Sequence, residues 1–260
     1  MNRIDRLFSE KDSDILNIYF TAGYPQRDDT ERIIYALDAV GVDLIEVGMP
    51  YSDPLADGET IQQSGTQAIR NGMTVERLFD QLARVRQRTQ LPLVLMGYVN
   101  QMLQYGDDRF LQRCVEVGVD GLILPDLPIF EYERDYQDRF EQLELNISFL
   151  VTPQTSEERI RKVDELTRGF IYLVSSASIT GGKTGMTDAQ LAYFERIRAM
   201  ELEHPCLIGF GISNHESYRT ACQYAQGAII GSAFIRALDG AEDVEAATRL
   251  FVRRVRNEEE

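Results

Sequence analysis

Residues 43–65 read DLIEVGMPYSDPLADGETIQQSG, and this stretch joins a buried strand to a loop that is rich in carboxylates. The segment 44–48 is apolar apart from Glu46, which is the pattern of a strand buried on both faces. A carboxylate in such a strand is costly unless it lies at the strand end or is hydrogen-bonded. Because Asp57 follows in the loop, two acids project from one strand–loop unit and indicate an acid/base pair.

Outward from this stretch, short apolar runs alternate with longer amphipathic stretches along the whole chain. The expected strands are 15–21, 44–48, 93–97, 121–125, 147–151, 170–175, 206–211 and 227–231. Between them, hydrophobic residues recur at the spacings of three and four that are typical of helices. About eight such strand–helix units predict a (β/α)8 TIM barrel. A doubly wound open sheet is the alternative, and the absence of a GxGxxG motif after the first strand argues against it.

The length of 260 residues accommodates one barrel or two smaller domains. No linker rich in proline, glycine or serine interrupts the pattern, so we expect a single barrel domain over residues 1–260. Residues 2–10 form an extra N-terminal helix in this interpretation, and its apolar face covers the bottom of the barrel. The stretch 59–89 is long for one helix, and Gly72 and Thr74 predict a division into two.

The composition narrows the classes of partner. A formal net charge of −15 disfavours binding to nucleic acid or to an anionic membrane. No apolar run approaches the roughly 18 residues of a membrane span, and the N-terminus lacks the apolar core of an export signal. The three cysteines show no CxxC spacing and are expected to be buried thiols, which favours a cytoplasmic location. Because the chain as a whole is acidic, an anionic substrate must be bound by locally placed groups and not by the overall charge of the protein.

Three glycine-containing strand ends are typical of a phosphate cradle. They lie at 179–182, 209–213 and 231–232. Glycine lets the backbone approach phosphate oxygens closely, and backbone N–H groups at a helix N-terminus bind a dianion without a basic patch. Barrels often carry this site after strands 7 and 8.

Other motifs fail on spacing. The run containing Lys183 lacks the first glycine of a P-loop, since Ala177 occupies that position. The glycines at 209 and 211 lack the third glycine of a dinucleotide fingerprint, because Asn214 stands there. Neither His204 nor His215 has a partner at metal-ligand spacing, so no metal site is expected.

The stretch 43–65 resembles the signature of tryptophan synthase alpha subunits, and the match extends through Gln62. Further matching segments are 19–23, 96–100, 124–128, 171–175, 179–181, 209–213 and 231–232. The resemblance implies the barrel fold and retro-aldol cleavage of indole-3-glycerol phosphate to indole and glyceraldehyde 3-phosphate. It also implies an α2β2 heterotetramer in which pyridoxal phosphate belongs to the beta subunit, so that no cofactor is expected in this chain.

The resemblance also implies roles for individual residues. Glu46 is the acid/base that moves protons at indole C3 and at the glycerol hydroxyl, and Asp57 is the carboxylate that hydrogen-bonds the indole N–H. The implied substrate-binding residues are Tyr19, Ile61, Met96, Tyr98, Tyr172, Thr180 and Phe210. The implied phosphate-binding residues are Gly181, Gly211, Gly231 and Ser232. The implied contacts with the beta subunit are Pro50 and Asp53.

Two departures from the family pattern concern loop closure and leave the catalytic pair unchanged. Glu59 stands where proline is usual, and the segment 176–180 lacks an early arginine. Two other functions stay open at this point. One is a binding subunit that mainly activates a beta partner. The other is a different phosphate-binding barrel, such as a sugar-phosphate isomerase. Such enzymes usually need another acid/base arrangement on strands 1 and 5, and the first strand here ends without an acid.

Overall fold

The computed structural model describes residues 1–174, 187–209 and 211–258. The strands are β1 (Ile15–Thr21), β2 (Leu44–Gly48), β3 (Leu93–Met96), β4 (Gly121–Ile123), β5 (Asn146–Ile147), β6 (Leu150–Val151), β7 (Ile171–Val174), β8 (Cys206–Gly209) and β9 (Gly227–Ile230). The helices are α1 (Arg3–Glu10), α2 (Asp29–Ala39), α3 (Glu59–Arg70), α4 (Val75–Val85), α5 (Val99–Tyr105), α6 (Asp107–Glu116), α7 (Ile129–Glu131), the π-helix η1 (Tyr132–Tyr136), α8 (Gln137–Gln142), α9 (Glu157–Leu166), α10 (Asp188–Ala199), α11 (His215–Cys222), α12 (Ser232–Leu238) and α13 (Val244–Arg256).

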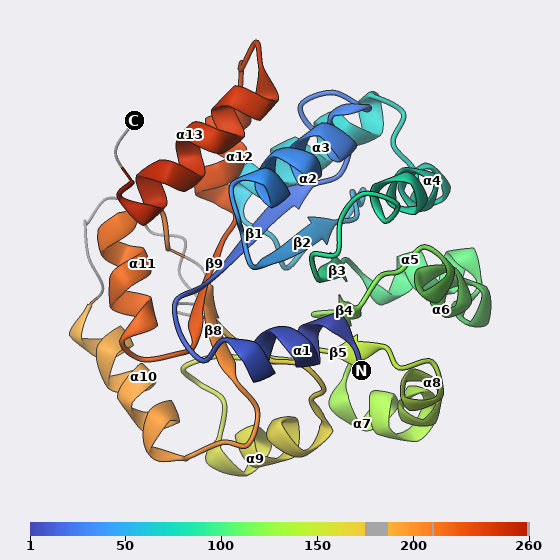
Figure 1. Cartoon of the computed structure of the whole chain (residues 1–260). Helices are drawn as coiled ribbons and strands as arrows, with labels where there is room; N and C mark the ends of the chain where they lie inside the picture. Colours follow the sequence, from blue (N-terminus) through green and yellow to red (C-terminus); the bar gives the residue numbers. More distant parts are fainter. Residues whose placement is uncertain (175–186, 210, 259–260) are drawn as a thin grey trace.

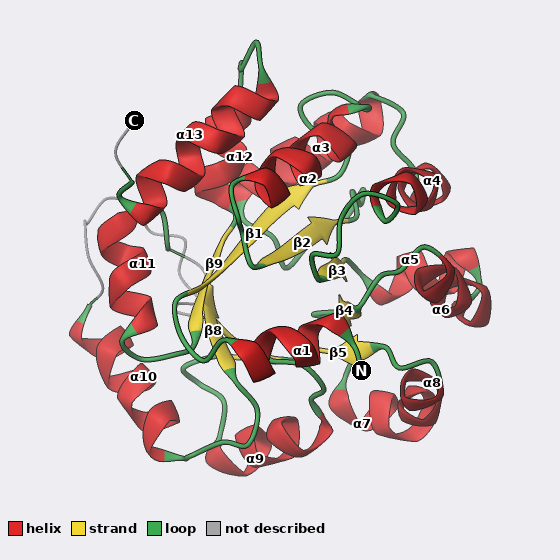
Figure 2. Cartoon of the chain, viewed as in Figure 1, coloured by secondary structure: helices red, strands yellow, loops and turns green. Residues whose placement is uncertain are grey.

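The strands form one parallel sheet in the order β5-β4-β3-β2-β1-β9-β8-β7-β6. Its two ends are consecutive in the chain, because β5 pairs with β4 while β6 pairs with β7. The strand expected at 147–151 is thus two short strands. Between them, Ser148 N–H donates to Leu122 O (3.1 Å) and Phe149 O accepts from Tyr172 N–H (3.0 Å), so the segment changes its pairing partner. This exchange closes the sheet into the (β/α)8 barrel, which confirms the expected fold (Figures 1 and 2).

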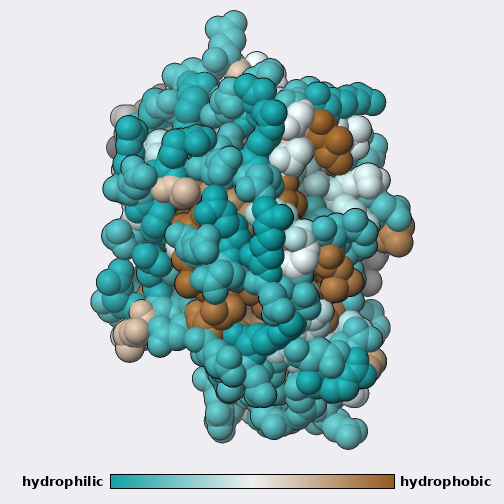
Figure 3. All heavy atoms as spheres, turned by 90° about the vertical axis from the view of Figure 1, so that its right-hand side faces the viewer, coloured by the Kyte–Doolittle hydropathy of each residue, from teal (hydrophilic) through white to brown (hydrophobic). Residues whose placement is uncertain are grey.

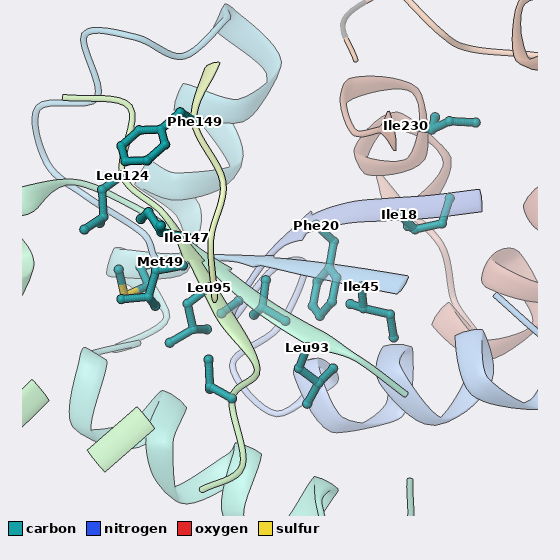
Figure 4. Packing of buried hydrophobic residues seen from close by; sticks show 14 of the residues in the cluster. Ile18, Phe20, Ile45, Met49, Leu93, Leu95, Leu124, Ile147, Phe149 and Ile230 are labelled. Atoms are coloured by element: carbon teal, nitrogen blue, oxygen red, sulfur yellow. The ribbon is translucent and has the colours of Figure 1, made fainter. Parts of the chain in front are cut away.

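Alternating side chains of the strands enter two separate hydrophobic clusters. The outer cluster lies between the sheet and the surrounding helices and includes Ile18, Phe20, Ile45 and Leu95 (Figure 4). The inner cluster fills the barrel and is formed by Ile4, Ile15, Tyr19, Leu44, Val94, Met96, Ile123, Phe170, Tyr172, Val174, Leu207, Ile229 and Ile235. Because both faces of every strand are covered, the strands are almost continuously apolar, and an inward polar side chain is conspicuous.

Helix α1 covers the N-terminal end of the barrel, as expected (Figure 1). Asn2 caps the helix by accepting from Ile4 N–H (2.9 Å), and its amide donates to Asp120 O (2.7 Å), just before β4. Ile4 is fully buried in the inner cluster, and Leu7 and Phe8 pack against the same cluster. Since the strands are parallel, their C-terminal ends meet at the opposite end of the barrel.

The stretch 59–89 contains two helices, as predicted. Gly72 adopts φ +82°, a conformation that glycine accepts readily, and it separates α3 from α4. Thr74 then caps α4 by accepting from Arg77 N–H at 3.2 Å.

Within the described residues, every helix is too short or too polar to cross a bilayer. The surface in Figure 3 is largely hydrophilic and carries a few separate hydrophobic patches.

Candidate active site

Strand register brings the first predicted catalytic residue next to two tyrosines. Glu46 of β2 pairs in register with Tyr19 of β1. Tyr172 of β7 and Tyr19 both belong to the inner cluster, so they enter the barrel from different strands. Leu44, two residues before Glu46 on β2, also belongs to this cluster, so the Glu46 side chain lies on the inward face of the strand. The charge of Glu46 raises the pKa of the Tyr172 phenol, after the larger effect of burial. Glu46 therefore faces the barrel interior from the strand that the sequence indicated.

The Glu46 side chain is completely buried. Asn17 of β1 donates from Nδ2 to Glu46 Oε1 at 2.5 Å, and Glu46 Oε2 has no hydrogen-bond partner in the described part of the chain. Burial raises the pKa of Glu46 to about 8, and the Asn17 bond opposes that rise. A carboxyl group with such a pKa exchanges a proton near neutral pH, as a general acid/base must.

Asp57 lies half-buried in the loop between β2 and α3. Tyr98 O–H donates to Asp57 Oδ2 at 3.2 Å, and the same hydroxyl accepts from Ala56 N–H at 3.0 Å. Burial raises the pKa of Asp57 to about 6, while the Tyr98 bond lowers it. Asp57 is therefore mainly ionised at pH 7, whereas Glu46 is mainly protonated. The two carboxyl groups thus differ in the way that separate acid and electrostatic roles require.

The charges of Asp57 and Glu46 both raise the pKa of the Tyr19 phenol. Burial raises the pKa of Tyr19 strongly, and the charges of Asp57 and then of Glu46 raise it further. The charges of both carboxyl groups also raise the pKa of the Tyr172 phenol, after the larger effect of burial.

Two glycines make room for these tyrosines. A Cβ added at Gly48 would lie 2.2 Å from the hydroxyl of Tyr19, and one added at Gly209 would lie 2.2 Å from the hydroxyl of Tyr172. Such distances are far below van der Waals contact, so any larger residue would displace the ring. Each phenol therefore occupies the space left by a missing side chain on the neighbouring strand.

The structure describes three of the other predicted wall residues, Met96, Ile61 and Tyr98. Met96 belongs to the inner cluster, and Ile61 of α3 packs against it. Tyr98 is buried and ties Asp57 to the start of α5. Thr180 and Phe210 lie outside the described residues.

The predicted phosphate binders lie at the ends of β8 and β9. Gly231 precedes Ser232, the first residue of α12, and a Cβ at Gly231 would lie 3.1 Å from Tyr19 Cδ1. Gly211 is exposed and has φ +78°, which favours glycine. The first N–H groups of a helix have no partner within the helix, so the start of α12 offers donors beside the Tyr19 ring. Gly181 lies outside the described residues.

The loop with the predicted partner residues is anchored to the site through Tyr98. The Tyr51 ring stacks on the Tyr98 ring at 5.1 Å between centroids, and Gln101 Nε2 donates to Pro50 O at 3.1 Å. Asp53 itself is exposed. A partner that moves this loop therefore acts on the residue that holds Asp57.

Sequence reasoning missed Asn17. The signal was available, because Asn17 is the single amide in the apolar run 15–21 and lies two residues before Tyr19, on the same face of the strand. The two histidines make local contacts: His204 Nδ1 lies 3.1 Å from Asp164 Oδ1, and His215 Nδ1 lies 2.8 Å from Val255 O. No group of three or more potential metal ligands occurs among the described residues.

The chain matches the family model described as "Tryptophan synthase alpha chain" over residues 7–259. It is 56% identical over 238 residues to a tryptophan synthase alpha chain of Flavobacterium psychrophilum, which covers 92% of this chain and 94% of that protein. It also resembles the crystal structure of tryptophan synthase subunit alpha from Legionella pneumophila, with a TM-score of 0.89 and 30% identity over 99% of this chain and 98% of that one. A tryptophan synthase complex from Pyrococcus furiosus gives a TM-score of 0.85 and 29% identity over 95% and 99%.

Proposed function

The chain belongs to the tryptophan synthase alpha chain family, and from this premise we propose how its residues carry out the family's reaction. The reaction is the cleavage of indole-3-glycerol phosphate to indole and glyceraldehyde 3-phosphate in tryptophan biosynthesis. The observation that carries our assignment is the pair of carboxyl groups, Glu46 and Asp57, whose pKa values burial raises to about 8 and about 6.

We assign the proton transfers to Glu46. In its neutral form it donates a proton to C3 of the indole ring, which moves positive charge toward the ring nitrogen. The resulting carboxylate then takes the proton of the hydroxyl on the carbon bonded to C3. The bond between that carbon and C3 breaks, its electron pair returns to the ring, and the products are indole and the aldehyde. Glu46 ends the cycle protonated, as it began, and one oxygen without a hydrogen-bond partner among the described residues suffices for both steps.

We assign the electrostatic role to Asp57. The ionised carboxylate accepts a hydrogen bond from the indole N–H and stabilises the cationic ring that C3 protonation creates. Tyr98 supports this role, because its hydroxyl donates to Asp57 and fixes the carboxylate. Gly181, Gly211, Gly231 and Ser232 are proposed to bind the phosphate of the substrate, and Thr180 is proposed as a further substrate-binding residue.

The experiment that tests the assignment compares the variants Glu46→Gln and Asp57→Asn with the parent chain, by indole release from indole-3-glycerol phosphate. Glu46→Gln should lower turnover by about 10²–10⁴-fold or more, since the amide neither donates nor accepts the transferred proton. Asp57→Asn should lower turnover less, because the amide oxygen still accepts the N–H bond. Glu195→Gln, an exposed change on α10, is the matched control and should leave turnover unchanged. A folded Glu46→Gln variant with parental turnover contradicts the assignment.

The partner is the tryptophan synthase beta subunit, in an α2β2 heterotetramer. We propose that the loop with Pro50 and Asp53 docks against it. Three exposed apolar side chains support the proposal that this end of the molecule is the docking face. They are Leu55, Leu103 and Phe130, which are 85%, 52% and 60% exposed. They follow β2, β3 and β4, which are neighbours in the sheet, so they share the C-terminal end of the barrel with the site.

Leu55→Asp should abolish complex formation with the beta subunit in light scattering, and with it any partner-dependent rise in cleavage rate. Val115→Asp is the matched control, because this apolar residue is 37% exposed on α6, away from the docking face. Complex formation by Leu55→Asp at parental affinity would place the interface elsewhere.

Three further expectations also stand as proposals. The alpha chain family works without a cofactor while pyridoxal phosphate belongs to the beta subunit, and we propose the same division here. We propose that residues 1–260 act as one domain, since all described strands belong to one sheet. We propose a cytoplasmic location because Cys114, Cys206 and Cys222 are free thiols.

A further inference from the structure

Asn17 is a buried amide in an otherwise hydrocarbon-lined layer of the barrel. It has no exposed surface, and its register partners are Leu44 on β2 and Ile229 on β9, both members of the inner cluster. Burying an amide without full hydrogen bonding destabilises the folded state. An apolar side chain at this position would pack as well, so the amide requires a reason other than the stability of the barrel.

Its contacts identify that reason. Asn17 Nδ2 donates to Glu46 Oε1 at 2.5 Å, while Asn17 Oδ1 and Glu46 Oε2 have no partner among the described residues. The bond ties the carboxylate to the side of the barrel nearer α1 and leaves one oxygen for chemistry. We propose that Asn17 is a positioning residue for Glu46: its amide holds one carboxylate oxygen in the barrel interior and leaves the other free for the reacting atoms. The inference rests on the acid/base role proposed for Glu46.

Asparagine suits both states of a group that gains and loses a proton. When Glu46 is ionised, Nδ2 donates to its oxygen, as observed. When Glu46 is neutral and carries its proton on Oε2, Oε1 is the carbonyl oxygen and still accepts from Nδ2. Leucine would bond neither state, and aspartate would repel the ionised state. Asn17 therefore keeps Glu46 in one place throughout the proton transfers.

Among the groups around Glu46, Asn17 is the one whose hydrogen bond lowers the pKa of the carboxyl group. Burial raises the pKa of Glu46, and the Asn17 hydrogen bond is the opposing influence. The nearest titratable side chains are the phenols of Tyr19 on β1 and Tyr172 on β7, whose pKa values the charge of Glu46 raises; Asp57, from the loop after β2, acts on the same two phenols. On β3, the register partner of Glu46 is the apolar Val94. Loss of the amide should therefore raise the pKa of Glu46.

The test uses the variants Asn17→Leu and Asn17→Ser, with Asn146→Leu as the matched control. Asn146 is another buried amide bonded to a carboxylate, since its Nδ2 donates to Asp5 Oδ1 at 2.8 Å, but it lies beside α1 at the N-terminal end of the barrel. The pKa of Glu46 is read directly by ¹³C NMR of chains labelled at glutamate Cδ, where the Glu46 signal is the one that Glu46→Gln lacks. Turnover and KM for indole-3-glycerol phosphate are measured over the same pH range.

In Asn17→Leu, the pKa of Glu46 should rise by about 1–2 units, the value of one hydrogen bond to a charged group. At pH 7, kcat should fall about 10-fold while KM stays within about twofold, because Asn17 does not touch the substrate. Asn17→Ser admits water beside Glu46, so its rise in the pKa of Glu46 and its loss of kcat should both be smaller than those of Asn17→Leu. If the leucine variant does not fold, the serine variant tests the inference by the same two measurements. Asn146→Leu should lower stability without moving the pKa or the pH profile.

An unmoved Glu46 signal and pH profile in a folded Asn17 variant would overturn the inference. So would an equal loss of kcat in Asn17→Leu and Asn146→Leu at an unchanged pKa, which is the mark of a merely structural role. Glu46→Gln separates the two ideas. Full activity in that variant refutes the acid/base role, whereas an inactive Glu46→Gln beside an unaffected Asn17→Leu refutes only the positioning role.

Discussion

Replacing Glu46 by glutamine should stabilise the chain, and the gain should grow with pH. The folded-state pKa of Glu46 is raised from 4.5 to about 8, chiefly by burial. A raised pKa means that the folded state holds the proton more tightly than the unfolded state does. The stability that depends on this proton is therefore present below pH 4.5 and is lost as the pH rises through 8. Glutamine is neutral at every pH and still accepts from Asn17.

The size of the effect follows from the two pKa values. Each unit of pKa difference corresponds to 1.36 kcal/mol. For a shift from 4.5 to about 8, the free energy of unfolding of the parent is lower by ~1 kcal/mol at pH 5 and by ~4 kcal/mol at pH 8 than it would be if Glu46 were neutral in both states. The free energy of unfolding of Glu46→Gln should thus exceed that of the parent by about 3 kcal/mol more at pH 8 than at pH 5.

Urea unfolding of the isolated chain at both pH values measures this difference. Glu195→Gln is the control, because an exposed carboxylate stays hydrated in the folded chain and its loss should change little at either pH. If Glu46→Gln is no more stable than the parent at pH 8, or if its advantage is the same at pH 5, then folding does not raise the pKa of Glu46 and the reasoning is refuted. A gain in stability together with a loss of turnover would identify a group retained for catalysis.

Three further outcomes are expected. Since the pKa of Asp57 is about 6, parental turnover should fall as the pH drops through 6, and Asp57→Asn should lack this limb; a limb that survives in the variant assigns it to another group. Gly231→Val should raise both KM and the Kd for glycerol 3-phosphate, and unchanged phosphate affinity by calorimetry would refute the proposed cradle. Gly48→Ala should cost about 1–3 kcal/mol in urea unfolding, because its Cβ would lie 2.2 Å from the hydroxyl of Tyr19. Gly65→Ala, in a helical position with nothing within 4 Å, should instead stabilise the chain, and equal effects of the two changes would contradict the packing argument.

Much of the architecture was predictable because its signals are local. The apolar runs became β1 to β9 within one or two residues at most ends, the helix before β1 covers the barrel, and Gly72 and Thr74 divide α3 from α4. Turn chemistry and hydrophobic periodicity act over a few residues and can be read in one dimension. The carboxyl pair was also visible, since an acid in a buried strand is anomalous wherever the strand lies.

The contacts within the site were decided by the tertiary structure. Asn17 meets Glu46, and Tyr19 lies against Gly48, because parallel pairing sets the register between β1 and β2. The strand expected at 147–151 divides because its two halves pair with different neighbours when the barrel closes. Hydrophobic periodicity indicates which face of a strand is buried, but it does not say which residue lies opposite. Register and closure arise only when the whole sheet assembles, and they place Asn17 against the carboxylate that the sequence had singled out.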